Sequence, residues 1–237
     1  PPRSTLFPYT TLFRSPSAVV FDNIFTKEYF EKKFRKHFYF IPYGAEVKEP
    51  AHDTSILDKL DVDPEKYILF VGRFIPDKGI HLLVRAFESV ATDMKLVLVG
   101  GSPNPDNYED EIHRTQDKRI IFAGYVYGDD TNILMKNAYM YVQPSLIEGL
   151  SPVILTVMGL GTPLVCSDIV ENKFITGDNA THFISGNSDS LAQKINYCLD
   201  NPEKLKQMAE DGKADILARF NWDSVASQYL ELFKRKK

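Results

Sequence analysis

The chain has few cysteines, no long apolar run and no large excess of charge of one sign. Its 237 residues include only two cysteines, Cys166 and Cys198, whose separation matches no metal-ligand spacing. We therefore expect reduced thiols, as is typical of a cytoplasmic protein. No apolar run approaches the roughly 20 residues of a membrane-spanning helix, so any membrane association is expected to be peripheral, at the inner face. The net charge of −4 predicts no general attraction to nucleic acid.

Two common nucleotide-binding sequences are also absent. The chain contains neither the G-x-G-x-x-G pattern of dinucleotide-binding folds nor the G-x-x-x-x-G-K-[ST] pattern of phosphate-binding loops. Their absence excludes the usual dinucleotide and Walker-type sites. It also argues against a Rossmann-like sugar-phosphate epimerase.

Short apolar runs alternate with helical sequence through most of the chain. A helix is predicted after the first of these apolar runs, because apolar residues recur there at helical spacing, at Ile80, Leu83, Phe87 and Val90. The apolar runs themselves are predicted to be strands, at residues 68–71, 95–99, 119–122, 139–142 and 164–166, with helical sequence between one strand and the next. This alternation predicts an α/β fold, a Rossmann-like parallel sheet with helices on both faces.

The N-terminal part of the chain is organised differently. Residues 1–16 repeat a Thr-Leu-Phe unit without periodicity, and we expect a non-native or disordered leader there. Residues 17–44 predict a single strand-helix-strand fragment, with Thr26 as the N-cap of its helix. Residues 45–65 are polar and contain proline, which is the composition of a linker.

Residues 142–168 predict a strand, a helix and a second strand around an acidic residue and a glycine. Pro144-Ser145 ends the first strand, Glu148-Gly149 opens the helical segment, and Gly161 closes it. In a parallel sheet this turn lies at the carboxyl edge, where the free N–H groups of a helix N-terminus attract anions. The segment therefore predicts an anion site beside Glu148.

The turns after the other strands bring glycines and two cations to the same edge. Glycines that follow or end strands are Gly72, Gly100, Gly101 and Gly124. In the first of these turns, Arg73 and Lys78 would complement a diphosphate, because the guanidinium binds as a fork and the ammonium as a point charge. From the residues alone, the more common explanation is that Arg73 is an ordinary surface residue and that Lys78 only begins a helix, without a ligand at either.

Taken in order, these segments resemble a known family. The resemblance is to the C-terminal half of family 4 glycosyltransferases (glycosyl transferases group 1) with the GT-B fold. It covers the chain from about Tyr67 onward, and its segments are Val71-Gly72-Arg73-Phe74, Lys78-Gly79, Val99-Gly100, Gly124-Tyr125-Val126, Pro144-Ser145, Glu148-Gly149 and residues 158–165. It implies transfer of a sugar from a nucleotide-diphosphate-sugar donor to a sugar or lipid-linked acceptor, in cell-surface polysaccharide or glycolipid synthesis, without a metal or other cofactor.

The resemblance also implies roles for individual residues. Glu148 would be the catalytic residue, facing the sugar and the charge that develops at its anomeric carbon. Arg73 and Lys78 would hold the diphosphate. The remaining donor-binding positions would be Gly72, Gly100, Gly101 and Gly124, the phosphate cradle Gly149, Leu150 and Ser151, and Tyr125 and Val126 beside the base.

Thr156 is also expected at a donor-binding position, but it departs from the family pattern. It stands where the family has a second glutamate that accepts hydrogen bonds from the ribose hydroxyls. Threonine is shorter and neutral, so donor binding is expected to be weaker by roughly 1.5 to 3 kcal/mol if nothing substitutes.

The resemblance also gives the domain organisation. Residues 66–220 correspond to the nucleotide-sugar-binding domain, and residues 221–237 to a helix that crosses back to the N-terminal domain. Only residues 17–44 represent that N-terminal domain, whose missing remainder is an expected partner. Two functions stay open: an active glycosyltransferase, or a catalytically incomplete nucleotide-sugar-binding module, truncated or degenerate.

Overall fold

The computed structural model describes residues 16–45, 47–48, 54–102 and 107–235. The predicted leader therefore lies outside the described residues, apart from Pro16. The chain divides into two compact units, one formed by residues 1–44 with 220–237 and the other by residues 45–219.

Among the described residues, the first unit contains two short parallel strands and two helices. Its elements are β1 (Val20–Phe21), α2 (Ile24–Phe34), β2 (Tyr39–Phe40) and α11 (Trp222–Lys234). Helix α2 begins earlier than predicted, because its N-cap is Asn23 and not Thr26. The Asn23 side chain accepts hydrogen bonds from the N–H groups of Phe25 (2.9 Å) and Thr26 (3.0 Å).

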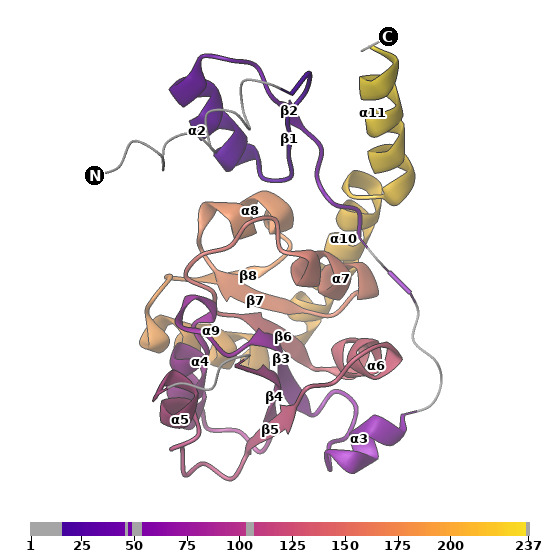
Figure 1. Ribbon diagram of the computed structural model, residues 1–237. Coiled ribbons are helices and arrows are strands. Elements are labelled where there is room, and N and C mark those ends of the chain that lie inside the picture. Colours follow the sequence, from indigo (N-terminus) through magenta and orange to yellow (C-terminus); the bar gives the residue numbers. More distant parts are fainter. Residues whose placement is uncertain (1–15, 46, 49–53, 103–106, 236–237) are drawn as a thin grey trace, which may run out of the picture. The chain divides into compact units, whose positions relative to one another are not determined.

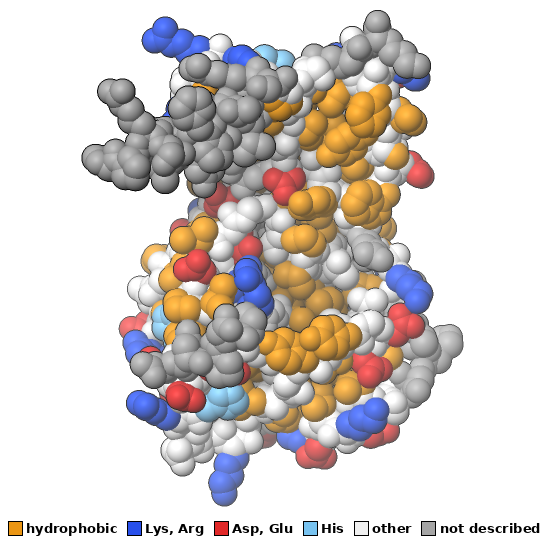
Figure 2. Space-filling model, viewed as in Figure 1, with side chains coloured by type: hydrophobic (Ala, Val, Ile, Leu, Met, Phe, Trp, Pro, Cys, Tyr) orange, Lys and Arg blue, Asp and Glu red, His pale blue; other side chains and the backbone are white. Residues whose placement is uncertain are grey.

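Helix α11 keeps part of its apolar surface exposed. Val225 and Leu232 are buried with Ile41 in the small core of this unit. Hydrophobic side chains also gather along the outside of the helix (Figure 2), and the exposed ones are Trp222, Tyr229, Leu230 and Phe233. The described part of the unit therefore buries only one face of α11.

The second unit is built on one parallel sheet, as predicted (Figure 1). In the described residues its strands are β3 (Tyr67–Arg73), β4 (Lys95–Gly101), β5 (Ile120–Gly124), β6 (Met140–Gln143), β7 (Leu164–Ser167) and β8 (Thr181–Phe183). They are arranged in the order β5-β4-β3-β6-β7-β8. The chain thus starts in the middle of the sheet, builds one half outward and returns beside β3 to build the other half.

Helices cover both faces of this sheet. They are α3 (Ser55–Lys59), η2 (Pro76–Lys78), α4 (Ile80–Glu88), α5 (Asn107–Ile112), α6 (Asp129–Asn137), α7 (Pro152–Leu160), α8 (Val170–Thr176), α9 (Ser188–Asp200) and α10 (Pro202–Arg219). Helices α4, α5 and α9 lie on one face, and α6 and α7 on the other (Figure 1). The short helices α3 and α8 were not predicted, and α3 falls within the segment expected to be a linker.

The core follows from strands that are apolar on both faces. Alternate residues of β3 and β4 pack with the apolar stripe of α4, and the members of this cluster include Phe70, Leu98, Leu83 and Phe87. The intervening residues Leu69 and Val97 are equally buried on the other face. Burial on both faces is what a near-continuous apolar strand requires.

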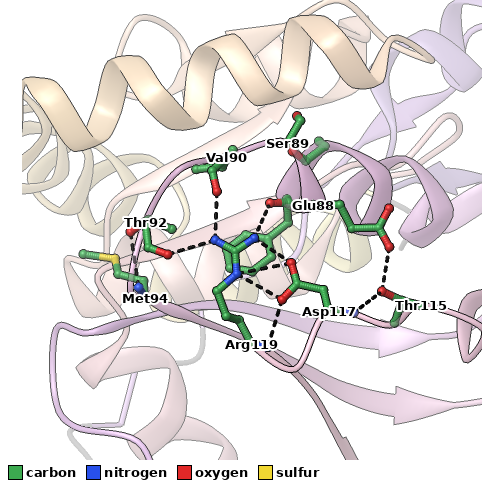
Figure 3. A network of polar contacts seen from close by, with 10 residues as sticks. Glu88, Ser89, Val90, Thr92, Met94, Thr115, Asp117 and Arg119 are labelled. Atoms are coloured by element: carbon green, nitrogen blue, oxygen red, sulfur yellow. Dashed lines mark hydrogen bonds and ion pairs between the residues drawn. The ribbon is translucent and has the colours of Figure 1, made fainter.

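A partly buried arginine joins the turn after α4 to the start of β5 (Figure 3). The guanidinium of Arg119 donates to the carbonyl oxygens of Val90 and Thr92, each at 2.8 Å, and forms an ion pair with Asp117. It also lies 4.7 Å from the centre of the Phe87 ring. The hydrogen bonds that the Arg119 side chain donates to Asp117 hold the pKa of this carboxyl below its ordinary value. Arg119 thus satisfies carbonyl groups of the turn that follows α4.

We expect Arg119→Met to lower the free energy of unfolding by about 2 kcal/mol, since hydrogen bonds to charged groups contribute on that scale and Asp117 loses its partner. Urea denaturation measures the change. Arg85→Met on the exposed side of α4 is the matched control and should change stability by less than about 0.5 kcal/mol. Equal stability of the two variants would contradict the assigned role.

Candidate functional site

Two turns meet at the carboxyl edge of the sheet, where the strand order reverses between β3 and β6. The N–H of Leu146 donates to the carbonyl oxygen of Asp77 at 2.8 Å. Gly79 has φ of +67°, and a Cβ there would lie 2.2 Å from the carbonyl oxygen of Pro144. The turns can approach this closely only with glycine at position 79. In open α/β sheets, ligands bind at such a switch point.

An ion pair spans the switch point. Nζ of Lys78, after β3, lies 2.6 Å from Oε1 of Glu148, after β6. The two side chains are 20% and 8% exposed, so the pair is largely withdrawn from water. The structure thus brings together a cation and an acid that were predicted to share one edge. Their roles toward a ligand stay predictions.

Glu148 has two further donors that the sequence did not reveal. Nε2 of Gln143 donates to its Oε1 at 2.6 Å, and Oγ of Ser145 donates to the same oxygen at 2.7 Å. Gln143 and Ser145 are buried. The available signal was a polar residue, Gln143, closing an otherwise apolar strand directly before Pro144-Ser145.

Tyr141 lies behind Gln143 in the same strand. Its hydroxyl contacts the carbonyl oxygen of Val71 at 2.9 Å, the N–H of Val71 at 3.2 Å and Oε1 of Gln143 at 3.1 Å. Burial raises the pKa of Tyr141, so its hydroxyl is protonated at neutral pH. This hydroxyl therefore bridges β6 to β3 beneath the ion pair.

Arg73 occupies the last position of β3, beside Gly101 in the register of β4. Its side chain is exposed, and among the described residues no hydrogen bond or ion pair holds it. Arg73 and Lys78 both lie at the carboxyl end of β3, in the strand's last residue and in the turn after it. In the described residues, Arg73 forms no hydrogen bond or ion pair with Glu148. Arg73 is therefore placed at the predicted edge as an unengaged cation.

The predicted glycines allow close packing of the strand ends. Gly72 and Gly100 are paired in register, and a Cβ at Gly100 would overlap the carbonyl oxygen of Gly72. The ring of Tyr125 covers Gly101, and a Cβ added at Gly101 would lie 3.0 Å from that ring. Gly124, at the end of β5, has φ of +67° and turns the chain toward Tyr125.

Tyr125 and Tyr127 form an exposed pair after β5. Their rings are parallel within 1°, with centres 6.0 Å apart, and are 53% and 75% exposed. Between them, the carbonyl oxygen of Val126 accepts a hydrogen bond from Thr131 (2.9 Å), which fixes the turn. Two flat apolar surfaces therefore lie at the edge where Tyr125 and Val126 were predicted to line a base.

Helix α7 starts later than the sequence suggested. Glu148-Gly149 was expected to open it, but Pro152 is its first residue and Ser151 its N-cap. Proline is favoured at this position because its missing N–H needs no partner there. Gly149 is exposed, whereas Leu150 and Ser151 are buried, so Glu148 lies on a short loop before the helix.

The hydroxyl of Thr156 is bonded within its own helix. It donates to the carbonyl oxygen of Pro152 at 3.2 Å. Thr156 is half-buried on α7, one turn into the helix. In this arrangement its hydrogen is not available to a ligand.

Other sites find little support in the described residues. There, no three histidine, cysteine, aspartate or glutamate side chains cluster as a metal ion would require. Both cysteines are buried, and burial raises their pKa values. No helix in the described part combines the length and apolar character needed to cross a membrane.

Comparison with known proteins identifies the family. The family described as Glycosyl transferases group 1 matches residues 54–215. The chain belongs to the glycosyl transferases group 1. This assignment confirms the predicted resemblance and covers the whole sheet of the second unit.

Relatives in this family include proteins of several named activities. An uncharacterized glycosyltransferase of Methanocaldococcus jannaschii is 30% identical over 73% of this chain and 45% of its own length. The alpha-maltose-1-phosphate synthase of Mycolicibacterium smegmatis is 27% identical over 79% of this chain and 52% of its own length. The chain thus spans about half the length of these curated relatives.

Solved glycosyltransferase structures share the GT-B fold. Sucrose-phosphate synthase of Thermosynechococcus elongatus has a TM-score of 0.82 at 22% identity, covering 99% of this chain and 62% of that one. HepE of Anabaena, in complex with UDP-glucose, has a TM-score of 0.83 at 21% identity, covering 94% of this chain and 65% of that one. At these identities the likeness concerns the fold.

Proposed function

We propose that this glycosyltransferase binds a nucleotide-diphosphate-sugar at the switch point and transfers the sugar to a sugar or lipid-linked acceptor. The observation that carries the proposal is the contact between Lys78 and Glu148 across that point. A cation for the diphosphate and an acid for the sugar lie on adjacent turns. The structures of HepE with UDP and with UDP-glucose support a ligand of this class.

The proposed chemistry is electrostatic and needs no metal. Lys78 and Arg73 neutralise the leaving diphosphate, together with the backbone N–H groups of the loop from Gly149 to Ser151. Glu148 faces the sugar and stabilises the positive charge that develops at its anomeric carbon. An O-antigen chain mannosyltransferase of Escherichia coli among the relatives supports cell-surface polysaccharide synthesis as the setting.

A second candidate is a nucleotide-sugar-binding module without turnover. One observation favours it: the hydroxyl of Thr156 is committed to its own helix. Hydrolysis of the donor, measured on this chain and on Thr156→Glu, separates the two functions. Binding without hydrolysis in both proteins supports the module, whereas hydrolysis in either supports the transferase.

We expect Arg73→Ala to weaken nucleoside diphosphate binding about tenfold, the loss of one charge-assisted contact. Titration calorimetry with UDP and with GDP measures the change. Arg114→Ala, which removes an exposed arginine after α5, is the control and should leave the affinity unaltered. The same affinity in Arg73→Ala and the unsubstituted protein would remove Arg73 from the site.

A further inference from the structure

The two carboxylate oxygens of Glu148 have different surroundings. Oε1 accepts three hydrogen bonds, from Lys78, Gln143 and Ser145, at 2.6 to 2.7 Å. No described residue donates to Oε2. The protein therefore satisfies one oxygen completely and leaves the lone pairs of the other free for a ligand or water.

The orientation of the Gln143 amide is fixed by its neighbours. A carboxylate only accepts hydrogen bonds, so the Gln143 NH2 group must face Glu148, and its second hydrogen reaches Oγ of Ser145 at 2.8 Å. Oε1 of Gln143 then faces the hydroxyl of Tyr141 at 3.1 Å. Because Tyr141, Gln143 and Ser145 are all buried, water cannot replace any of these partners.

The chain of contacts is anchored outside the loop that carries Glu148. Its far end is the backbone of Val71 in β3, which Tyr141 contacts from β6. On the other side, Oγ of Ser167 in β7 donates to the carbonyl oxygen of Ser145 at 2.5 Å and accepts from Asn172 at 3.0 Å. Three adjacent strands thus fix the groups that hold Glu148.

We propose that Gln143 is a positioning residue, which holds Glu148 in place when the ligand draws Lys78 toward its diphosphate, so that Oε2 meets the donor sugar. This inference rests on the proposed function. Lys78 contacts Oε1 while the site is free, but a diphosphate competes for the same ammonium group. The hydrogen bonds from Gln143 and Ser145 involve no ligand, and they keep the carboxylate fixed during that exchange.

The test compares ligands that differ only in the sugar. Affinities for UDP and UDP-glucose, and for GDP and GDP-mannose, are measured by calorimetry for the unsubstituted protein and for Gln143→Met. Methionine matches glutamine in size but donates no hydrogen bond. We expect Gln143→Met to weaken the nucleotide sugar about tenfold and the nucleoside diphosphate less than about twofold. Gln193→Met, at an exposed glutamine of α9, is the control and should change neither.

Gln143→Glu adds a readout that a merely structural role would not produce. At pH 8 two carboxylates would face each other, and nucleotide-sugar binding should be weak. Near pH 5.5 the pair shares a proton and regains one donor, so binding should recover in Gln143→Glu but not in Gln143→Met. Thermal melts of each variant verify that it is folded.

Each outcome decides the inference. The inference is supported if Gln143→Met selectively loses affinity for the nucleotide sugar and if Gln143→Glu regains that affinity at low pH. If Gln143→Met leaves all affinities unchanged, or lowers the affinities for the nucleotide sugar and the nucleoside diphosphate equally, the inference is overturned while the proposed function stands. Failure of the unsubstituted protein to bind any of the four ligands would overturn the proposed function and this inference together.

Discussion

Replacing Lys78 by methionine is expected to weaken nucleoside diphosphate binding roughly 100-fold, more than any other single change at the site. The variant loses a charge-assisted contact, which contributes about 1.5 to 3 kcal/mol. It also leaves the charge of Glu148 uncompensated, so that a second anion would have to enter beside a largely buried carboxylate. Titration calorimetry with UDP and with GDP measures the loss.

A double substitution separates these two contributions. In Lys78→Met/Glu148→Gln the repelling charge is gone, so roughly tenfold of the affinity should return, and the two single changes should not be additive. Lys118→Met, at an exposed lysine before β5, is the control for loss of a positive charge. If Lys78→Met bound as tightly as Lys118→Met, Lys78 would have no part in diphosphate recognition.

The largest effect on stability is expected for Gly79→Ala, about 3 to 4 kcal/mol in urea denaturation. Its φ of +67° costs a residue with a side chain about 1 to 2 kcal/mol. The new Cβ would also lie 2.2 Å from the carbonyl oxygen of Pro144, and overpacking of that kind costs about 1 to 3 kcal/mol. Since backbone must move to relieve the contact, the turns that carry Lys78 and Glu148 should separate and nucleotide affinity should fall as well.

Gly161→Ala is the matched control. Gly161 ends α7 with φ of 77° and ψ of 27°, close to the 67° and 22° of Gly79, but a Cβ there would meet only the flexible side chain of Lys213 at 3.3 Å. Its cost should be limited to the backbone share, about 1 to 2 kcal/mol. Equal destabilisation of both variants would show that the contact with Pro144 is unimportant.

The sequence was sufficient to predict the parallel sheet, apart from its short edge strand β8, and the meeting of its key turns. Strands buried on both faces produce continuous apolar runs, and their alternation with the stripe Ile80, Leu83 and Phe87 indicates a parallel arrangement. Parallel strands bring their carboxyl ends to one edge, which is why Lys78 and Glu148 could be expected to approach each other.

The support behind Glu148 could not be predicted in the same way. Gln143 and Tyr141 alternate with apolar residues in a short strand, and a pattern does not show that two polar side chains face a third one on the following loop. The N-cap of α2 was placed at Thr26 because threonine is a good cap, but Asn23 competes for the same N–H groups and starts the helix earlier. Helices as short as α8 carry too few residues for a periodic signal.

The Lys78–Glu148 pair joins residues 70 positions apart in the chain. Between them lie β4, β5 and the helices that connect them, which complete one half of the sheet. Closing so long a loop is entropically unfavourable until that intervening half has formed. Binding of a ligand at this pair should therefore require β3 to β6 to be folded together, and no single local segment can form the site alone.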